Sequence, residues 1–217
     1  MTSEMLAPGS VQVPPTVRIG SLAPDFAARG TMGEMQLSQF RGRWLLFFSH
    51  PADFTPVCTS ELLAFAKAAP RFYKLKCSLL ALSVDSLYSH LAWSAAIRSA
   101  TGVEIPFPIV EDPSMTIGMA YGMIDDQAQS TATIRSSYFI DPDGIVRAIL
   151  SYPASVGRSI EEHLRLLQAL QNVTSGHLAP AEWQPGDSML APPLHTQEEM
   201  FKNLDDGRWF YRSADDA

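Results

Sequence analysis

Cysteine is scarce in this chain, since its 217 residues include only two. Two cysteines do not make the disulfide scaffold that stabilises many small secreted domains, so any cysteine function must come from thiol reactivity. Positive charge is also scarce: 16 Lys and Arg stand against 23 Asp and Glu, for a formal net charge of −7, and no basic block stands out. We therefore expect no nucleic-acid partner, because binding nucleic acid normally needs a basic face.

Long apolar runs and targeting features are lacking as well. No stretch approaches the roughly 18 to 20 apolar residues that a membrane helix needs, so we predict no membrane span. The first ten residues, MTSEMLAPGS, contain neither the basic segment nor the apolar segment of a secretory signal. We therefore expect a cytoplasmic protein, and a reducing compartment would keep both cysteines as thiols.

The usual sequence signatures of bound metals and nucleotides are missing too. The chain contains no Cys-x-x-Cys and no His-x-x-x-His, and its five histidines are scattered. We find no glycine-rich phosphate loop and no dinucleotide-binding pattern after a strand. The sequence therefore predicts no metal and no cofactor.

What the chain does have is enough apolar surface for a packed core, with 46% hydrophobic residues. The run WLLFFS at 44–49 predicts a strand buried on both faces, and helical spacing of apolar residues over 56–75 predicts an amphipathic helix after it. By the same criteria we expect strands at 78–84, 106–112, 133–141 and 145–152, and helices at 89–102, 116–121 and 159–171. The last two strands, joined by Pro-Asp-Gly, predict an antiparallel hairpin. These alternating elements indicate an α/β fold with a mixed central sheet flanked by helices.

The composition changes after residue 172. The C-terminal part is rich in proline and has no clear periodicity, yet it retains large apolar side chains that need burial. Such an arm could pack on its own domain, but we favour packing on a second subunit, because exposed aromatic patches usually mark interfaces. We therefore divide the chain into an N-terminal segment (1–15), a core domain (16–172) and a C-terminal dimerisation arm (173–217).

One cysteine, Cys58, lies in the segment HPADFTPVC at 50–58, directly after the first buried strand. Thr55 is expected to cap the following helix and Pro56 to be its first residue, which places Cys58 in the first turn. There the unpaired backbone N–H groups and the helix dipole favour a thiolate, the nucleophilic form of cysteine. Free cysteine is also one of the most buried residue types, so on this residue alone a packing role is the stronger interpretation.

The spacing of Pro51, Thr55 and Cys58, written Pro-x-x-x-Thr-x-x-Cys, resembles the active-site signature of the peroxiredoxins. The longer string FFSHPADFTPVCTSEL is similar to the one-cysteine subgroup, related to mammalian peroxiredoxin 6 and archaeal thiol peroxidases. Further stretches match in family order between residues 16 and 210, among them LALSVDSLYSHLAW, TIRSSYFIDPDGIVR, YPASVGRSIEE and PAEWQPGD. The resemblance implies a thioredoxin-like α/β core with a C-terminal arm.

By this resemblance the protein is a thiol-dependent peroxidase that reduces hydrogen peroxide and organic hydroperoxides. Cys58 is then the peroxidatic cysteine, which attacks the peroxide and becomes a sulfenic acid. Thr55 is expected to hydrogen-bond the sulfur and the peroxide, and Pro51 to shield the site from water. Arg135 matches the family arginine that stabilises the thiolate and the oxygen charge developing as the O–O bond breaks. Taken alone, an arginine in a strand more often points to solvent.

Three further residues resemble supporting members of the site. His50 could hydrogen-bond the oxidised sulfur or tune the pocket, and a structural role at the strand end is a comparably good interpretation. Glu61 and Arg158 are expected to orient the arginine and the sulfur, or else to form an ordinary surface ion pair.

Cys77 raises the question of how the sulfenic acid is reduced. The intervening helix would hold the two cysteines on the order of 20 to 28 Å apart, whereas a disulfide needs Cα atoms within roughly 7 Å. We therefore expect inert packing for Cys77 and a one-cysteine cycle completed by an external thiol reductant. Thiol-disulfide exchange has little support, because Cys58 has no vicinal thiol. A redox-sensing or chaperone-like scaffold is kept as the alternative, and the resemblance implies a homodimer, or a decamer of five dimers.

Overall fold

The computed structural model describes residues 17–124, 132–173, 176–203 and 207–216, so the predicted N-terminal segment (1–15) lies outside the described residues. The strands are β1 (Ala27–Gly30), β2 (Gly33–Gln36), β3 (Trp44–Ser49), β4 (Cys77–Ser83), β5 (Ile109–Glu111), β6 (Arg135–Ile140) and β7 (Val146–Tyr152). The helices are α1 (Pro56–Lys74), α2 (Leu87–Thr101), α3 (Thr116–Ala120), α4 (Ile160–Val173) and α5 (Gln197–Lys202), with 3₁₀ turns η1 (Leu37–Phe40) and η3 (Ala214–Asp216).

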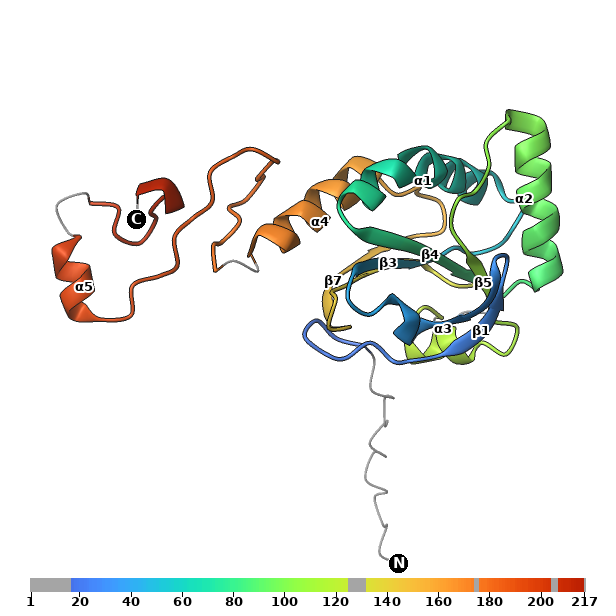
Figure 1. Cartoon of the computed structure of the whole chain (residues 1–217), viewed down its shortest axis with the longest axis horizontal. Helices are drawn as coiled ribbons and strands as arrows, with labels where there is room; N and C mark the ends of the chain where they lie inside the picture. Colours follow the sequence, from blue (N-terminus) through green and yellow to red (C-terminus); the bar gives the residue numbers. More distant parts are fainter. Residues whose placement is uncertain (1–16, 125–131, 174–175, 204–206, 217) are drawn as a thin grey trace, which may run out of the picture.

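The strands form one mixed sheet in the order β2-β1-β5-β4-β3-β6-β7 (Figure 1). Strands β3, β4 and β5 are parallel, whereas β6 pairs antiparallel with β3 and β7 antiparallel with β6. Each parallel step needs a crossover, which α1 supplies between β3 and β4 and α2 supplies between β4 and β5. The predicted mixed sheet with flanking helices is confirmed, and the arrangement is the expected thioredoxin-like one.

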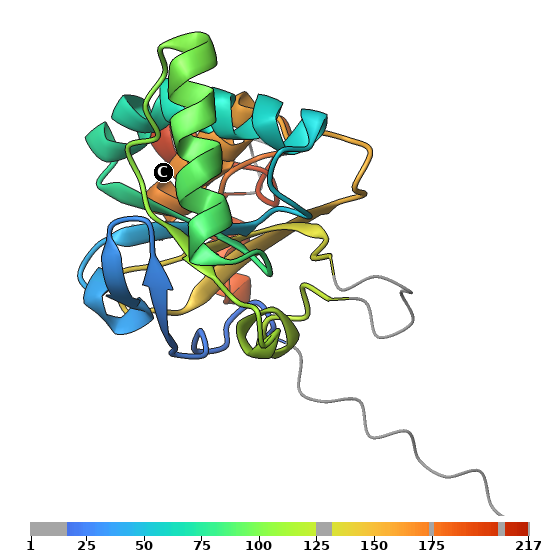
Figure 2. The same ribbon diagram turned by 90° about the vertical axis from the view of Figure 1, so that its right-hand side faces the viewer.

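Alternation along β3 divides the core into two layers. All six residues of β3 are buried, and side chains along a strand point to opposite faces in turn. Leu46 and Phe48 pack in one cluster with residues of α1, α2 and α4, while Leu45 and Phe47 pack in the other with residues of η1 and α3. Figure 2 shows α1 and α4 on one side of the sheet and α3 on the other.

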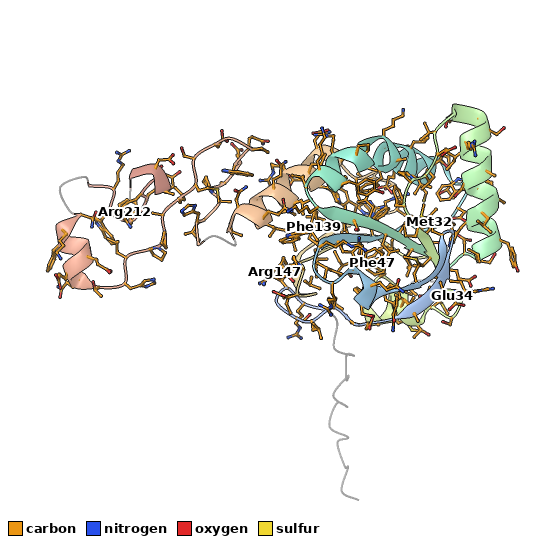
Figure 3. The ribbon with its side chains drawn as sticks, in the orientation of Figure 1. Met32, Glu34, Phe47, Phe139, Arg147 and Arg212 are labelled. Atoms are coloured by element: carbon orange, nitrogen blue, oxygen red, sulfur yellow. The ribbon has the colours of Figure 1, made fainter. Side chains whose placement is uncertain are left out.

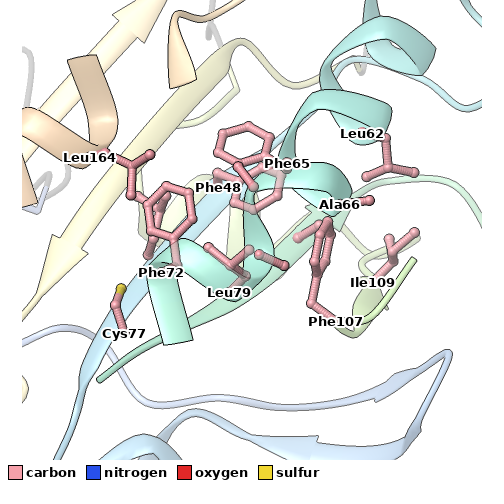
Figure 4. Packing of buried hydrophobic residues seen from close by; sticks show 14 of the residues in the cluster. Phe48, Leu62, Phe65, Ala66, Phe72, Cys77, Leu79, Phe107, Ile109 and Leu164 are labelled. Atoms are coloured by element: carbon pink, nitrogen blue, oxygen red, sulfur yellow. The ribbon is translucent and has the colours of Figure 1, made fainter. Parts of the chain in front are cut away.

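Aromatic rings fill the first layer. The rings of Phe48 and Phe65 stack with centroids 4.3 Å apart, and Phe72 lies 6.2 Å from Phe65 (Figure 4). In the view with side chains drawn as sticks, Phe47 and Phe139 both lie within the packed interior (Figure 3). The strand and the helix that carry the candidate site are therefore held on a rigid base.

The long elements lie close to their predicted positions, and two differences have physical causes. Strand β5 is shorter than the predicted 106–112, because the prolines at its start cannot donate to the sheet ladder. The β1–β2 hairpin was not predicted, because it lies at the sheet edge and is mostly exposed, so its residues show no apolar alternation. The predicted stop of α2 is confirmed: Gly102 has φ 73°, in the left-handed region that favours glycine.

The C-terminal arm, described over 176–203 and 207–216, extends away from the core domain (Figure 1). One connection to the core is Trp183, which is 3% exposed and whose carbonyl accepts a hydrogen bond from Arg165 of α4 at 3.1 Å. By contrast, three aromatic side chains of the arm are more than half exposed in the single chain: Phe201, Phe210 and Tyr211. In the part of the chain that the structure describes, no helix combines the length and apolar character needed to cross a membrane.

Candidate active site

Helix α1 begins directly after the loop 50–55, as the threonine and proline pattern predicts. Thr55 is the N-cap residue, with an extended backbone (φ −94°, ψ 149°), and Pro56 is the first helical residue. Cys58 lies in the first turn and is 1% exposed. The predicted N-cap position is confirmed, but the Thr55 side chain makes no capping hydrogen bond, because its hydroxyl donates to the carbonyl of Ala52 at 2.9 Å instead. The hydroxyl therefore stabilises the loop rather than the helix end.

Arg135 reaches the sulfur from the first residue of β6. It lies on the same face of the strand as Phe139, which belongs to the core layer under α1 and α4. Its Nη1 donates to Cys58 Sγ at 3.3 Å and to Glu61 Oε2 at 2.7 Å. Its Nε and Nη2 both donate to the carbonyl of Ala154, at 3.0 and 2.7 Å. The side chain is 2% exposed, so the alternative of a solvent-facing strand arginine is wrong.

Glu61 and Arg158 form a buried ion pair rather than a surface one. Glu61 Oε1 accepts from the backbone N and the Nε of Arg158, at 2.7 and 2.9 Å, and Oε2 accepts from Nη2 at 2.8 Å. Burial alone would raise the pKa of Glu61, but the hydrogen bonds and charges of Arg158 and Arg135 hold it below its usual value. The carboxylate thus stays ionised and fixes both guanidinium groups.

The charges of these four side chains balance only when the sulfur is ionised. Arg135 and Arg158 supply two positive charges and Glu61 one negative charge, so a Cys58 thiolate brings the sum to zero. All four residues lie between 1% and 6% exposed. An unbalanced charge in such a buried site is costly. The two guanidinium groups can therefore compensate a negative charge on the sulfur.

A second polar cluster connects the loop 50–55 with α2. His50 Nε2 is 2.8 Å from Asp53 Oδ1, and His90 of α2 places its Nδ1 2.7 Å from Asp53 Oδ2. Burial lowers the pKa of His50. Burial alone would raise the pKa of Asp53, but the hydrogen bonds from both histidines outweigh it and lower the pKa. Asp53 therefore joins the loop to α2 as a buried carboxylate.

These three residues are also of the types that hold metal ions. Sequence spacing made the histidines look scattered, whereas the fold brings His50 and His90 to one carboxylate. The nitrogens that face Asp53 are already hydrogen-bonded to it, so the cluster is satisfied on that side without an ion.

Among the other residues singled out by sequence, Pro51 is half-buried in the loop 50–55, and its shielding role stays a prediction. Sequence reasoning missed Asp53 and His90, which are linked only through the fold. It also missed His163 of α4, which is 0% exposed. A signal for His163 was present, since it is a polar residue within the apolar stripe of that helix.

Cys77 is the first residue of β4 and is 2% exposed, as predicted. Its thiol donates to the carbonyl of Ser78 at 3.5 Å. Burial raises the pKa of Cys77 to about 12, so it is a neutral thiol at pH 7. Figure 4 shows Cys77 at the margin of the core layer that contains Phe72 and Leu79. Most of α1 lies between Cys58, in its first turn, and Cys77 in the sequence.

Residues 19–149 match the AhpC/TSA family, and residues 169–207 match the C-terminal domain of 1-Cys peroxiredoxin. The chain is 48% identical over 188 residues to peroxiredoxin 2 of Caldanaerobacter subterraneus, covering 86% of this chain and 85% of the relative. It is 45% identical over 187 residues to the peroxiredoxin of Thermoplasma volcanium, covering 86% and 91%.

Among solved structures, the fold resembles a yeast mitochondrial 1-Cys peroxiredoxin with a TM-score of 0.79 and 38% identity, over 86% of this chain and 92% of that one. It also resembles a cysteine-to-serine mutant of peroxiredoxin 6 of Arenicola marina, with a TM-score of 0.77 and 33% identity, over 86% and 88%. The chain therefore belongs to the peroxiredoxin family and is a thiol-dependent peroxidase of its 1-Cys group.

Proposed function

We propose that Cys58 is the peroxidatic residue of this thiol-dependent peroxidase. The observation that carries the proposal is the 3.3 Å contact between Arg135 Nη1 and Cys58 Sγ, in a buried group of charges that balances only with a thiolate. The thiolate attacks the terminal oxygen of the peroxide, the O–O bond breaks, and the sulfur becomes a sulfenic acid. The other oxygen leaves with the bond electrons, takes a proton, and is released as water or an alcohol.

Arg135 is proposed to stabilise both the thiolate and the charge on the leaving oxygen, because its guanidinium already points at the sulfur. Thr55 donates its proton to Ala52, which leaves its oxygen lone pairs available to accept from a peroxide O–H. Pro51 is proposed to limit water around the sulfur from the loop side. Hydrogen peroxide and organic hydroperoxides are the proposed substrates.

The reducing half of the cycle is proposed to use an external thiol. One thiol attacks the sulfenic sulfur and releases water, and a second thiol then cleaves the mixed disulfide and returns Cys58 to the thiol. In the yeast mitochondrial 1-Cys peroxiredoxin, thiol resolution proceeds via glutathione and thioredoxin systems. We propose that a small-molecule thiol or a protein thiol of this kind also reduces the present chain. The buried, neutral thiol of Cys77 supports an external rather than an internal reductant. The relatives and solved structures described above are peroxiredoxins, which favours this function over the scaffold alternative.

Stopped-flow oxidation of reduced protein by hydrogen peroxide tests the proposal with two matched cysteine variants. Cys77→Ser is expected to keep the fast phase of the wild type, and Cys58→Ser to lose it. Trapping with dimedone followed by peptide mass spectrometry should find the sulfenic acid on Cys58. A fast phase in Cys58→Ser, or a label on Cys77, would contradict the assignment.

The C-terminal arm is proposed to pack on a second copy of the chain, so that the protein is a homodimer, with a decamer of five dimers as the larger alternative. The exposed Phe201, Phe210 and Tyr211 support this, because they need cover that the single chain does not supply. We keep the boundaries 1–15, 16–172 and 173–217 as part of the same proposal. A cytoplasmic location also stays a prediction, supported by two cysteines that are both free thiols.

A further inference from the structure

His163 is a buried titratable residue that the proposed reaction does not use. It lies on the inner face of α4 next to Leu164 and is 0% exposed. Two aromatic rings enclose it: Phe65 of α1 lies 5.7 Å away at 90°, and Phe139 of β6 lies 5.6 Å away. An apolar side chain of similar size would suit this position better, unless the imidazole nitrogens are needed.

Both nitrogens of His163 are hydrogen-bonded, and the partners determine the tautomer. Nδ1 is 2.7 Å from the carbonyl oxygen of Ser159, which can only accept, so Nδ1 carries the proton. Nε2 is 3.0 Å from the hydroxyl of Ser137. Burial lowers the pKa of His163 to about 4, so the ring is neutral at pH 7 and Nε2 must accept. The hydroxyl proton of Ser137 is therefore directed at His163.

The oriented hydroxyl of Ser137 can then accept a hydrogen bond from the other side. Arg158 Nη1 donates to Ser137 Oγ at 3.2 Å and to the carbonyl of Ser136 at 3.2 Å. The guanidinium also lies over the rings of Phe48 and Phe65, at 5.1 and 5.5 Å from their centroids. Arg158 is thus held in one orientation on the side away from Glu61.

The remaining contacts lead to the sulfur. Arg158 makes three hydrogen bonds to the Glu61 carboxylate, which accepts from Arg135, which donates to Cys58. We propose that His163 is a positioning residue for the peroxidase reaction: through the Ser137 hydroxyl it holds Arg158 and Glu61, and thereby the Arg135 guanidinium, in place against Cys58. The inference rests on the proposed role of Cys58 as the peroxidatic residue.

The charged groups around His163 come from its own helix and from the network beyond Ser137. Arg158 lies beyond Ser137, Glu61 beyond Arg158, and Glu162 on the same helix. A leucine at 163 would fill the volume but offer no acceptor, so the Ser137 hydroxyl could rotate and would no longer present a fixed lone pair to Arg158. A glutamine could still place a carbonyl oxygen near the position of Nε2.

The test compares His163→Leu with His163→Gln, measuring the rate of Cys58 oxidation by hydrogen peroxide as a function of pH. Since one buried hydrogen bond is lost, we expect His163→Leu to slow the reaction about threefold to tenfold. We also expect its reactivity to begin at a higher pH, because Arg135 is less well held. His163→Gln is expected to restore most of the rate. Leu164→Ala, a core change in the same helix, should lower stability to urea while leaving the rate and pH profile unchanged.

Ser137→Ala tests the same connection with a smaller change and serves if His163→Leu does not fold. It should reproduce the rate loss of His163→Leu, and combining Ser137→Ala with His163→Gln should remove the rescue. A wild-type rate and pH profile in both His163→Leu and Ser137→Ala would overturn the proposal, as would equal losses in His163→Leu and His163→Gln. Failure of the proposed function would appear differently, as wild-type protein whose fast oxidation does not depend on Cys58.

Discussion

Replacing Arg135 with methionine removes the positive charge beside Cys58 and keeps an unbranched side chain. Arg135 Nη1 lies 3.3 Å from the sulfur, and two unit charges at that distance attract by about 5 kcal/mol at an effective dielectric constant of about 20. Glu61, 2.7 Å from the same nitrogen, offsets part of this attraction. We therefore expect the reaction with hydrogen peroxide to slow by roughly 10² to 10³-fold, the range seen when one donor to a developing charge is removed.

The variant should remain folded, because Glu61 keeps three hydrogen bonds from Arg158 and is not left as an unpaired buried charge. Its reactivity should also begin at a higher pH, since the thiolate has lost its nearest cation. Stopped-flow oxidation across the acid and alkaline range measures both effects. Arg135→Lys should be intermediate, because it restores the charge but not the fork of donors shared between Cys58, Glu61 and a backbone carbonyl.

The matched control is Arg147→Met, which removes an arginine from the neighbouring strand β7. Its side chain is 44% exposed and pairs with Asp141, at the end of the β6–β7 pair opposite to Arg135. This variant should react like the wild type. If Arg135→Met and Arg147→Met have the same rate at every pH, the electrostatic reasoning is wrong.

Three further predictions concern acid, the second thiol and the arm. Burial lowers the pKa of His163 from 6.5 to about 4, so the unfolded chain binds more protons than the folded protein between these two pH values. The free energy of unfolding should therefore fall by roughly 3 kcal/mol as the pH drops through this range. Urea titrations at several pH values should show that the free energy of unfolding depends less on pH in His163→Leu. Iodoacetamide should leave Cys77 unmodified in the native protein, because burial raises its pKa to about 12; its alkylation before unfolding, detected by peptide mass spectrometry, would contradict this. Phe210→Asp should shift the protein from dimer toward monomer in analytical ultracentrifugation. Met32→Asp, which changes an exposed residue on the surface of the core domain, should not.

The fold could be predicted where burial leaves a periodic trace in the sequence. Strand β3 is buried on both faces and reads as an unbroken apolar run, and α1 shows its buried stripe at helical spacing. The edge hairpin β1–β2 leaves no such trace, because most of its side chains face solvent. The same limit applies to Thr55: its place before α1 follows from local pattern, but the acceptor of its hydroxyl is decided by the path of the loop.

The sequence by itself determined that Cys58 sits in the first turn of a helix after a buried strand, because caps, prolines and apolar periods act over a few residues. Through its motif it also indicated the peroxiredoxin family. Only the tertiary structure decided what surrounds the sulfur. Arg135 is 77 residues from Cys58, and Arg158 is 97 residues from Glu61. Their meeting depends on the register of β6 beside β3 and on the packing of α1 over the sheet, which no local pattern encodes.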